Sequence, residues 1–295
     1  MSGPGRARSW LYVPGHRPDL VRKALDGPAD AVVVDLEDAV PAAAKERARA
    51  TAVAVCGTDP GRVWVRLNGA GTPWAEDDAA ALAGRAVAGL RVPKAEDPAA
   101  VAALAERTGA PLHLLVESAR GLRAAFDLAA CHPLVAGVAP GETDLAADLR
   151  VRDRGELGWA RARIVTANRA AGLASPVASV WTDLADTAGL TADCLALRDG
   201  GFFGRSVIHP SQIGPVHRVF TPGRDEVERA RALLASVGAG GDAAWVDEHG
   251  RFVDPAVVAG ARWVADLADS LAGHRTGPPL HDDEPAGLPA GKETS

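Results

Sequence analysis

The chain has 295 residues, of which 47% are hydrophobic and 24% are charged, and this composition is typical of one large globular domain. The formal net charge is −6 and the basic residues are scattered, which argues against a nucleic-acid-binding surface. No apolar run is long enough to cross a membrane and the N-terminal residues pass directly into strand-like sequence, so we expect a cytoplasmic protein without a signal peptide.

Strand-like apolar runs alternate with Ala-rich segments of helical composition along most of the chain. The eight runs lie at residues 9–14, 31–38, 62–68, 89–95, 111–118, 134–141, 175–183 and 202–210, with helix-like segments such as 42–55, 97–108 and 159–172 between them. This alternation predicts parallel strands joined by right-handed helical crossovers. Eight units favour an α/β fold of the (β/α)8 TIM-barrel type over residues 1–220, although an open doubly wound sheet remains an alternative on this pattern.

The C-terminal quarter of the chain has a different character. Residues 221–270 read as two helices separated by the short β-like segment WVDEHGRFVD, and we interpret them as a helical extension of the barrel that could reach a neighbouring subunit. Residues 271–295 are rich in Gly, Pro, Asp and Glu without periodicity. We expect this tail to be disordered.

Two acids follow consecutive predicted strands at matched positions. Glu117 ends the run PLHLLVES, and Asp144 follows LVAGVAPG. Because neighbouring parallel strands lie roughly 4.8 Å apart and end at the same edge, the two carboxylates could share one Mg²⁺, which prefers oxygen ligands and keeps several waters. A single acid beyond a strand is more often an ordinary surface residue, but the matched positions favour a metal site.

Three further acids, Asp35, Glu37 and Asp38, follow the second strand in the sequence VVVDLEDAV. Alternation places Asp35 and Glu37 on one side and Asp38 on the other, so only part of the cluster can face the site. We interpret them as partners of metal-bound waters, since three neighbouring acids repel one another unless a cation is near. A solvated loop that caps the helix beginning near Pro41 is the alternative, and it would explain Asp38 well.

Cationic and polar side chains also lie at strand ends. Arg66 ends the third strand, where its planar fork could grip a carboxylate in bidentate fashion; a salt bridge to the preceding acids is an equally open alternative. Asn68 would follow as an orienting amide. Arg17, beside the first Pro-Gly turn, could meet a phosphate or lie in an ordinary exposed loop. His209 precedes a proline, and the sequence contains no Gly-rich phosphate fingerprint, Ser elbow or Cys/His nucleophile pair, which disfavours a hydrolytic triad.

Taken in order, these motifs resemble the HpcH/HpaI aldolase and citrate lyase beta subunit (CitE-like) family, which includes malyl- and citramalyl-CoA lyases. The resemblance rests on RSWLYVPGHRP, VVVDLEDAV, VWVRLN, RVPKAE, LLVESARG, GETDL, SVWTDLADTAGL and GFFGRSVIHPSQI, and it covers roughly residues 8–270. It implies a (β/α)8 barrel that binds Mg²⁺ and cleaves or forms a carbon–carbon bond in a 3-hydroxy-carboxyacyl thioester. It further implies that Glu117 and Asp144 are the metal ligands and that Arg66 holds the substrate carboxylate.

Two positions depart from the family pattern. Many relatives have Glu immediately before the metal-binding Asp, whereas this chain has the order Glu142-Thr143-Asp144. We therefore expect either a different arrangement of the outer shell or a Glu142 that reaches the site by another route. Relatives also often carry Lys where Arg205 stands here, so a cation is retained.

The resemblance implies a lyase whose substrates are an acyl-CoA and a 2-oxo acid. Arg66, Glu117, Asn68 and Arg17 would contact substrate. The proton-transfer candidates are Asp35, Asp38 and, in the C-terminal extension, Asp254, for which helix N-capping is an equal alternative. A thioesterase, a malate-synthase-like enzyme and a citrate lyase subunit acting on an acyl-carrier protein remain alternatives. The resemblance also implies a homo-oligomer, a trimer or hexamer.

Overall fold

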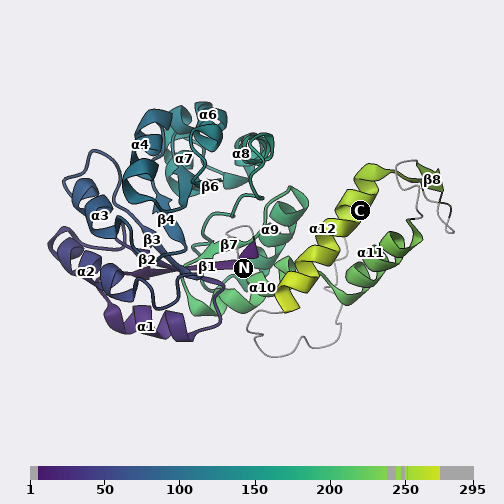
Figure 1. The fold of residues 1–295 in the computed structure, drawn as a ribbon, viewed down its shortest axis with the longest axis horizontal. Coiled ribbons are helices and arrows are strands. Elements are labelled where there is room, and N and C mark those ends of the chain that lie inside the picture. The colour runs from purple at the N-terminus through teal and green to yellow at the C-terminus, as the bar shows by residue number, and fades with distance from the viewer. Residues whose placement is uncertain (1–5, 238–243, 247–249, 251, 273–295) are drawn as a thin grey trace, which may run out of the picture.

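The computed structural model describes residues 6–237, 244–246, 250 and 252–272 (Figure 1). Its centre is one curled sheet of seven parallel strands in the order β6-β5-β4-β3-β2-β1-β7. The strands are β1 (Ser9–Pro14), β2 (Ala31–Asp35), β3 (Val63–Arg66), β4 (Gly89–Val92), β5 (Leu112–Val116), β6 (Val135–Pro140) and β7 (Arg205–Val207). The expected alternation of strands and helices is therefore present, and the parallel strands bring all their carboxyl ends to one edge.

Helices connect the strands and surround the sheet (Figure 1). They are α1 (Pro18–Asp26), α2 (Lys45–Val55), α3 (Ala75–Leu82), α4 (Pro98–Thr108), α5 (Ala119–Arg123), α6 (Ala125–Ala130), α7 (Glu142–Leu149), α8 (Gly158–Ala170), α9 (Thr187–Asp199) and α10 (Ile213–Phe220), with 3₁₀ turns at Ala42–Ala44, Arg154–Leu157 and Pro210–Gln212. The bounds of α4 follow from local sequence signals. Asp97 caps its start by accepting a hydrogen bond from the Ala99 N–H, Pro98 takes the first helical position, and Gly109 ends the helix at φ 65°.

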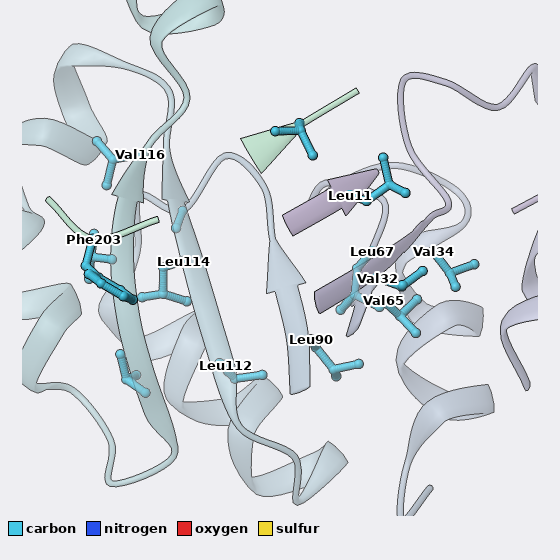
Figure 2. Close-up of a cluster of buried hydrophobic side chains, with 14 of the residues drawn as sticks. Leu11, Val32, Val34, Val65, Leu67, Leu90, Leu112, Leu114, Val116 and Phe203 are labelled. Carbon is cyan, nitrogen blue, oxygen red and sulfur yellow. The ribbon is translucent and has the colours of Figure 1, made fainter. Parts of the chain in front are cut away.

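Alternate strand residues face two different layers. Residues such as Leu11, Val32 and Leu114 pack against the helices in the main hydrophobic core, part of which is drawn in Figure 2. The intervening residues face inward, where Trp10 and Trp64 meet in a second, smaller cluster. This division follows from the alternation of side chains along a strand. The outward faces of the central strands are apolar, whereas the inward faces also carry buried polar residues such as Arg91 and His113.

The seventh predicted strand, at residues 175–183, is reduced to one backbone bridge, between Ala178 and Arg205 of β7. The eighth, at residues 202–210, is a strand only over Arg205–Val207. The reason lies on the outer edge of β6. The Val138 N–H donates to the Asn168 side-chain oxygen at 3.0 Å, and the Asn168 amide nitrogen donates to the Val138 carbonyl at 2.8 Å. One buried side chain from α8 thus makes the hydrogen bonds that a neighbouring strand would make.

Replacing Asn168 by Leu should therefore destabilise the fold by about 2 kcal/mol or more, because it leaves the buried N–H and C=O of Val138 without partners. Urea denaturation of purified protein at pH 7 measures the change. Thr166→Ala on the same helix is the control, since the exposed Thr166 hydroxyl bonds only within its own helix and should cost about 0.5 kcal/mol or less. Equal stability of Asn168→Leu and the wild type would show that Asn168 does not replace the strand.

The C-terminal extension consists of α11 (Arg224–Ser236), β8 (Trp245–Val246), β9 (Phe252–Val253) and α12 (Pro255–Ala272), with β8 and β9 antiparallel. It lies to one side of the barrel-like part (Figure 1). Near its end, α12 returns to the main core, which includes Leu267 and Leu271. The predicted tail beyond Ala272 lies outside the described residues, and the predicted boundaries at residues 220 and 270 stay predictions. Among the described helices, none is both long and apolar enough to span a bilayer.

Candidate active site at the strand ends

The chemically distinctive side chains gather where the strands end. Asp35 ends β2, Arg66 ends β3, Lys94 follows β4, Glu117 follows β5 and Asp144 lies in the first turn of α7, after β6. They come from five consecutive strand–helix units, and parallel pairing brings them to the same edge of the sheet. The site residues predicted from the sequence are thus brought together by topology, with the exceptions described below.

The Arg66 guanidinium is held by Asp35. Its Nε donates to Asp35 Oδ1 at 2.6 Å and its Nη2 donates to Asp35 Oδ2 at 2.7 Å, so the fork is closed on one carboxylate. The backbone N–H groups of Glu37 and Ala39 also donate to Asp35, which is fully buried. The ring of Tyr12 lies under the guanidinium, with its centroid 5.0 Å from Cζ. This is the salt-bridge arrangement, and it leaves only Nη1 of Arg66 turned away from Asp35.

The other two acids of the cluster surround Nη1. Asp38 is exposed, and its Oδ2 lies 3.3 Å from Arg66 Nη1. Glu37 is buried; its Oε1 accepts from Lys94 Nζ at 2.7 Å, while its Oε2 lies 3.0 Å from Nη1 without a hydrogen bond among the described residues. Burial raises the pKa of Glu37, although Arg66 and Lys94 oppose the shift.

Asn68 is committed to a different network. Its Oδ1 accepts from Lys45 Nζ at 2.6 Å, and its Nδ2 donates to Asp78 Oδ2 at 2.6 Å. Lys45 also donates to the carbonyls of Leu36 and Glu37. Both ends of the buried Asn68 amide are therefore used to hold the loop after β2, and its contact with substrate stays a prediction.

Glu117 is buried at the end of β5, where its side chain packs against the backbone of Gly141. Its Oε2 accepts the Lys94 backbone N–H at 3.0 Å, and a Cβ on Gly141 would lie 2.4 Å from Glu117 Cγ, so only glycine fits there. Burial, followed by the negative charges of Glu37 and Asp144, raises the pKa of Glu117 to about 8. A bound cation would offset the burial of Glu117 and favour its ionised form, so the raised pKa is consistent with a metal ligand.

Asp144 is exposed and close enough to Glu117 to raise the pKa of that group. Among the described residues no three His, Cys, Asp or Glu side chains form a metal-binding group. A cation at this position would take the two carboxylates and complete its shell with water or substrate oxygens, which is how Mg²⁺ is commonly bound. The chemistry of Glu117 and Asp144 fits that ion.

Glu142, two residues before Asp144, does not turn toward Glu117. Arg161 grips its carboxylate with Nε and Nη2 at 2.7 and 2.9 Å, and Arg154 Nη2 donates to it at 2.9 Å. Burial alone would raise the pKa of Glu142, but these two arginines outweigh it and lower the pKa. The departure from the family pattern thus places a structural ion pair between α7, α8 and the turn at Arg154–Leu157.

Three other residues singled out from the sequence are engaged in contacts of their own. Arg17 forms an exposed ion pair with Asp19, at 2.9 Å. Arg205 is fully buried on β7 and binds Asp193 of α9 at 2.7 Å. Asp254 accepts the Val257 N–H at 2.9 Å at the start of α12, the geometry of an N-cap, and the start of that helix lies well away from the strands β2 to β6 (Figure 1).

Three further residues received no role from the sequence, although Lys94 follows a predicted strand in the motif RVPKAE. Lys94 has φ 52°, a left-handed conformation that is rare outside glycine, and Tyr12 lies between two guanidinium groups. Arg91 lies beneath Tyr12, over the ring of Trp10, and is almost completely buried. The PK sequence after the fourth strand was the available signal for Lys94; nothing in the apolar run GLRV distinguishes Arg91 as an inward-facing cation.

Comparisons with known proteins find relatives that align with most of the chain. The profile of the HpcH/HpaI aldolase/citrate lyase family matches residues 8–210. The chain is 38% identical to the (3S)-malyl-CoA thioesterase of Cereibacter sphaeroides, with 78% of this chain and 82% of that protein aligned. It is 32% identical to the L-malyl-CoA/beta-methylmalyl-CoA lyase of the same species, with 90% and 95% aligned.

A solved structure of CitE from Mycobacterium tuberculosis, in complex with magnesium, acetoacetate and coenzyme A, resembles this chain with a TM-score of 0.76 at 33% identity. The alignment covers 90% of this chain and 98% of that structure. The similarity therefore extends beyond the family profile into the C-terminal extension.

Proposed function

Because the chain belongs to the HpcH/HpaI aldolase/citrate lyase family, we propose that it is a Mg²⁺-dependent carbon–carbon lyase that splits a 3-hydroxy-carboxyacyl-CoA into a 2-oxo acid and an acyl-CoA, or joins them. Malyl-, citramalyl- and citryl-CoA are the candidate substrates. The observation that carries the proposal is the buried Glu117 carboxylate, whose pKa is raised to about 8 beside a second carboxylate, Asp144. The fold in this proposal is the eight-unit barrel, with residues 175–183 in the place of its seventh strand.

Glu117 and Asp144 would hold the cation, which when bound supplies Lewis-acid polarisation of the substrate's hydroxyl and carbonyl oxygens. Asp35 accepts four hydrogen bonds, so its part is to fix the Arg66 guanidinium rather than to carry a proton. Asp38 is exposed and touches only Nη1 of Arg66, which leaves it free to accept the hydroxyl proton as the carbon–carbon bond breaks. The electron pair passes to the thioester enolate, whose carbon must then receive a proton.

A purified protein assayed with Mg²⁺ against malyl-CoA, citramalyl-CoA and citryl-CoA tests the proposal, with the 2-oxo acid and the acyl-CoA as readouts. Removal of Mg²⁺ by EDTA should stop product formation, and added Mg²⁺ should restore it. Absence of a 2-oxo acid from all three substrates would contradict the lyase.

A malyl-CoA thioesterase is the second candidate, favoured by the 38% identity to the protein of that name. It would release free CoA and malate in place of glyoxylate and acetyl-CoA, so a thiol reagent applied to the same assay separates the two. A malate-synthase-like enzyme would release free CoA only when glyoxylate and acetyl-CoA are supplied together. For a citrate lyase subunit, an acyl-carrier protein would replace CoA as the carrier.

We also place Asp254 in the proposal, as the acid that protonates the enolate carbon in the site of a second copy of the chain within a cytoplasmic trimer or hexamer. If this is right, Asp254→Asn should lower kcat by roughly 10²-fold or more with unchanged stability, because Asn caps a helix as well as Asp. The measurement is steady-state kinetics together with urea denaturation.

Mixtures of Arg66→Ala and Asp254→Ala chains should then regain activity, since some sites combine an intact arginine with an intact acid. Full activity of Asp254→Asn would leave only the observed N-cap. An inactive Asp254→Asn that shows no recovery in verified mixed oligomers would confine the acid to its own chain.

Binding of Mg²⁺ should depend on pH. The pKa of Glu117 is about 8, raised by burial, so below that pH a bound cation must displace a proton from Glu117. The apparent affinity should rise by up to about tenfold for each pH unit between pH 6 and 8, then level off. Titration calorimetry in buffers of different ionisation enthalpy measures both the affinity and the released proton, and Glu117→Gln should release none. An affinity independent of pH over this range would contradict the assignment of Glu117 as a ligand.

A further inference from the structure

Lys94 joins the two acidic groups of the site. Its backbone N–H donates to Glu117 Oε2 at 3.0 Å, and its side-chain Nζ donates to Glu37 Oε1 at 2.7 Å. The residue adopts φ 52°, which costs free energy for any side chain with a Cβ and persists only where surrounding contacts enforce it. Gly69 leaves room for this placement, since a Cβ there would lie 3.3 Å from Lys94 Cδ.

The cationic side chains at the strand ends differ in how many of their hydrogen-bond donors are already used. Arg66 uses Nε and Nη2 on Asp35 and one N–H of Nη1 on Asp38. Lys45 uses its three N–H groups on Asn68 and two carbonyls. The Lys94 ammonium has three donors and makes one hydrogen bond within the described part of the chain. About half of its side chain is exposed to solvent, at 53%.

We infer that Lys94 binds the carboxylate of the 2-oxo acid, sharing it with Nη1 of Arg66. This inference rests on the proposed lyase function and adds to it the residue that receives the substrate's negative charge. Glu37 lies between the two cations, so it holds both head groups in place without filling all their donors. Lys94 can contribute this ammonium while its backbone N–H stays on Glu117, because the two contacts use different parts of the residue.

The test compares the wild type with Lys94→Met by titration calorimetry, using pyruvate and glyoxylate as probes in the presence of saturating Mg²⁺. Met keeps the backbone N–H and approximates the length of the side chain, so Mg²⁺ affinity without the oxo acid should stay within about threefold. The Kd for the oxo acid should rise about 10- to 100-fold, as expected for loss of hydrogen bonds to a charged group. Lys23→Met removes an exposed charge on α1 and is the matched control, with an unchanged Kd expected.

The possible failures can be told apart. A wild type that binds neither probe with Mg²⁺ would overturn the proposed function and this inference with it. A wild type that binds a probe, together with an equally good Lys94→Met, would overturn the role of Lys94 alone. If Lys94 served only to neutralise Glu37, adding Glu37→Gln to Lys94→Met would restore binding; continued loss in the double variant is the result expected here.

Discussion

Replacing Glu117 by Gln, or Asp144 by Asn, is expected to abolish Mg²⁺-dependent cleavage while the chain remains folded. A neutral amide oxygen is a much weaker ligand for a hard cation than a carboxylate. Two carboxylates are the proposed ligands, so loss of either leaves one charged ligand. We expect kcat/KM to fall by roughly 10³-fold or more for each variant, since the cation is required for the chemical step.

The stability of the two variants makes the test sharper. Burial raises the pKa of Glu117 from 4.5 to about 8, so without metal the ionised group opposes folding increasingly between these pH values, and the full cost is reached above pH 8. Glu117→Gln should therefore be at least as stable as the metal-free wild type at pH 8, by urea denaturation. Glu156→Gln, at an exposed position, is the control for loss of one charge. Retained Mg²⁺-dependent activity in either site variant would remove the metal assignment.

Replacement of Arg66 by Met should lower the free energy of unfolding by about 3–5 kcal/mol, in addition to its effect on catalysis. Asp35 is fully buried and its two oxygens both bind the Arg66 fork, so the variant leaves a buried carboxylate without its counter-charge. Arg66→Lys keeps the charge but loses the fork. Because the fork is closed on Asp35, a substrate carboxylate would reach Nη1 of Arg66 alone, so its binding should weaken by less than the about 2 kcal/mol expected for loss of a bidentate contact.

Urea denaturation and substrate kinetics on the same proteins separate these effects. Combining Arg66→Met with Asp35→Asn should recover part of the lost stability, because the uncompensated charge is gone, and the double-mutant cycle measures the coupling. If Arg66→Lys leaves KM and kcat within twofold, Arg66 is only a salt-bridge partner of Asp35. An Arg66→Met protein as stable as the wild type would contradict the structural part of the argument.

Much of the fold could be predicted because the inner strands are continuous apolar runs bounded by turn residues. The run at 9–14 is a strand over the same residues, and the run at 111–118 is a strand over Leu112–Val116. The run at 175–183 misled the prediction, since SPVASV has strand composition but its neighbour β6 is already satisfied by Asn168. That contact depends on a side chain from a distant helix, which no local pattern reveals.

The sequence predicted which strand-end residues lie near one another, because parallel strands all end at the same edge of the sheet. Which contacts they make could not be predicted. Asp35 and Arg66 pair because each buried charge needs a partner of opposite sign. Glu142 turns away from the site because it pairs with Arg154 and Arg161. The left-handed backbone of Lys94 could not be inferred, since lysine has no preference for it and tertiary contacts impose it.

The Asn168 contact closes one edge of the sheet with a side chain, and we expect the sheet to open more readily there than between paired strands. Strands β1 to β5 have a hydrogen-bonded strand on each side, whereas β6 pairs with β5 alone. Just after β6, the Ser179 hydroxyl accepts the Glu142 N–H at the start of α7, at 3.1 Å. Among the amides of the sheet, we expect hydrogen exchange to be fastest in β6, where it faces residues 175–183. Asp144 belongs to the helix that begins there. A bulky thioester could therefore gain access to the site by local opening at this edge, while the strands that carry Asp35, Arg66 and Glu117 keep their hydrogen bonds.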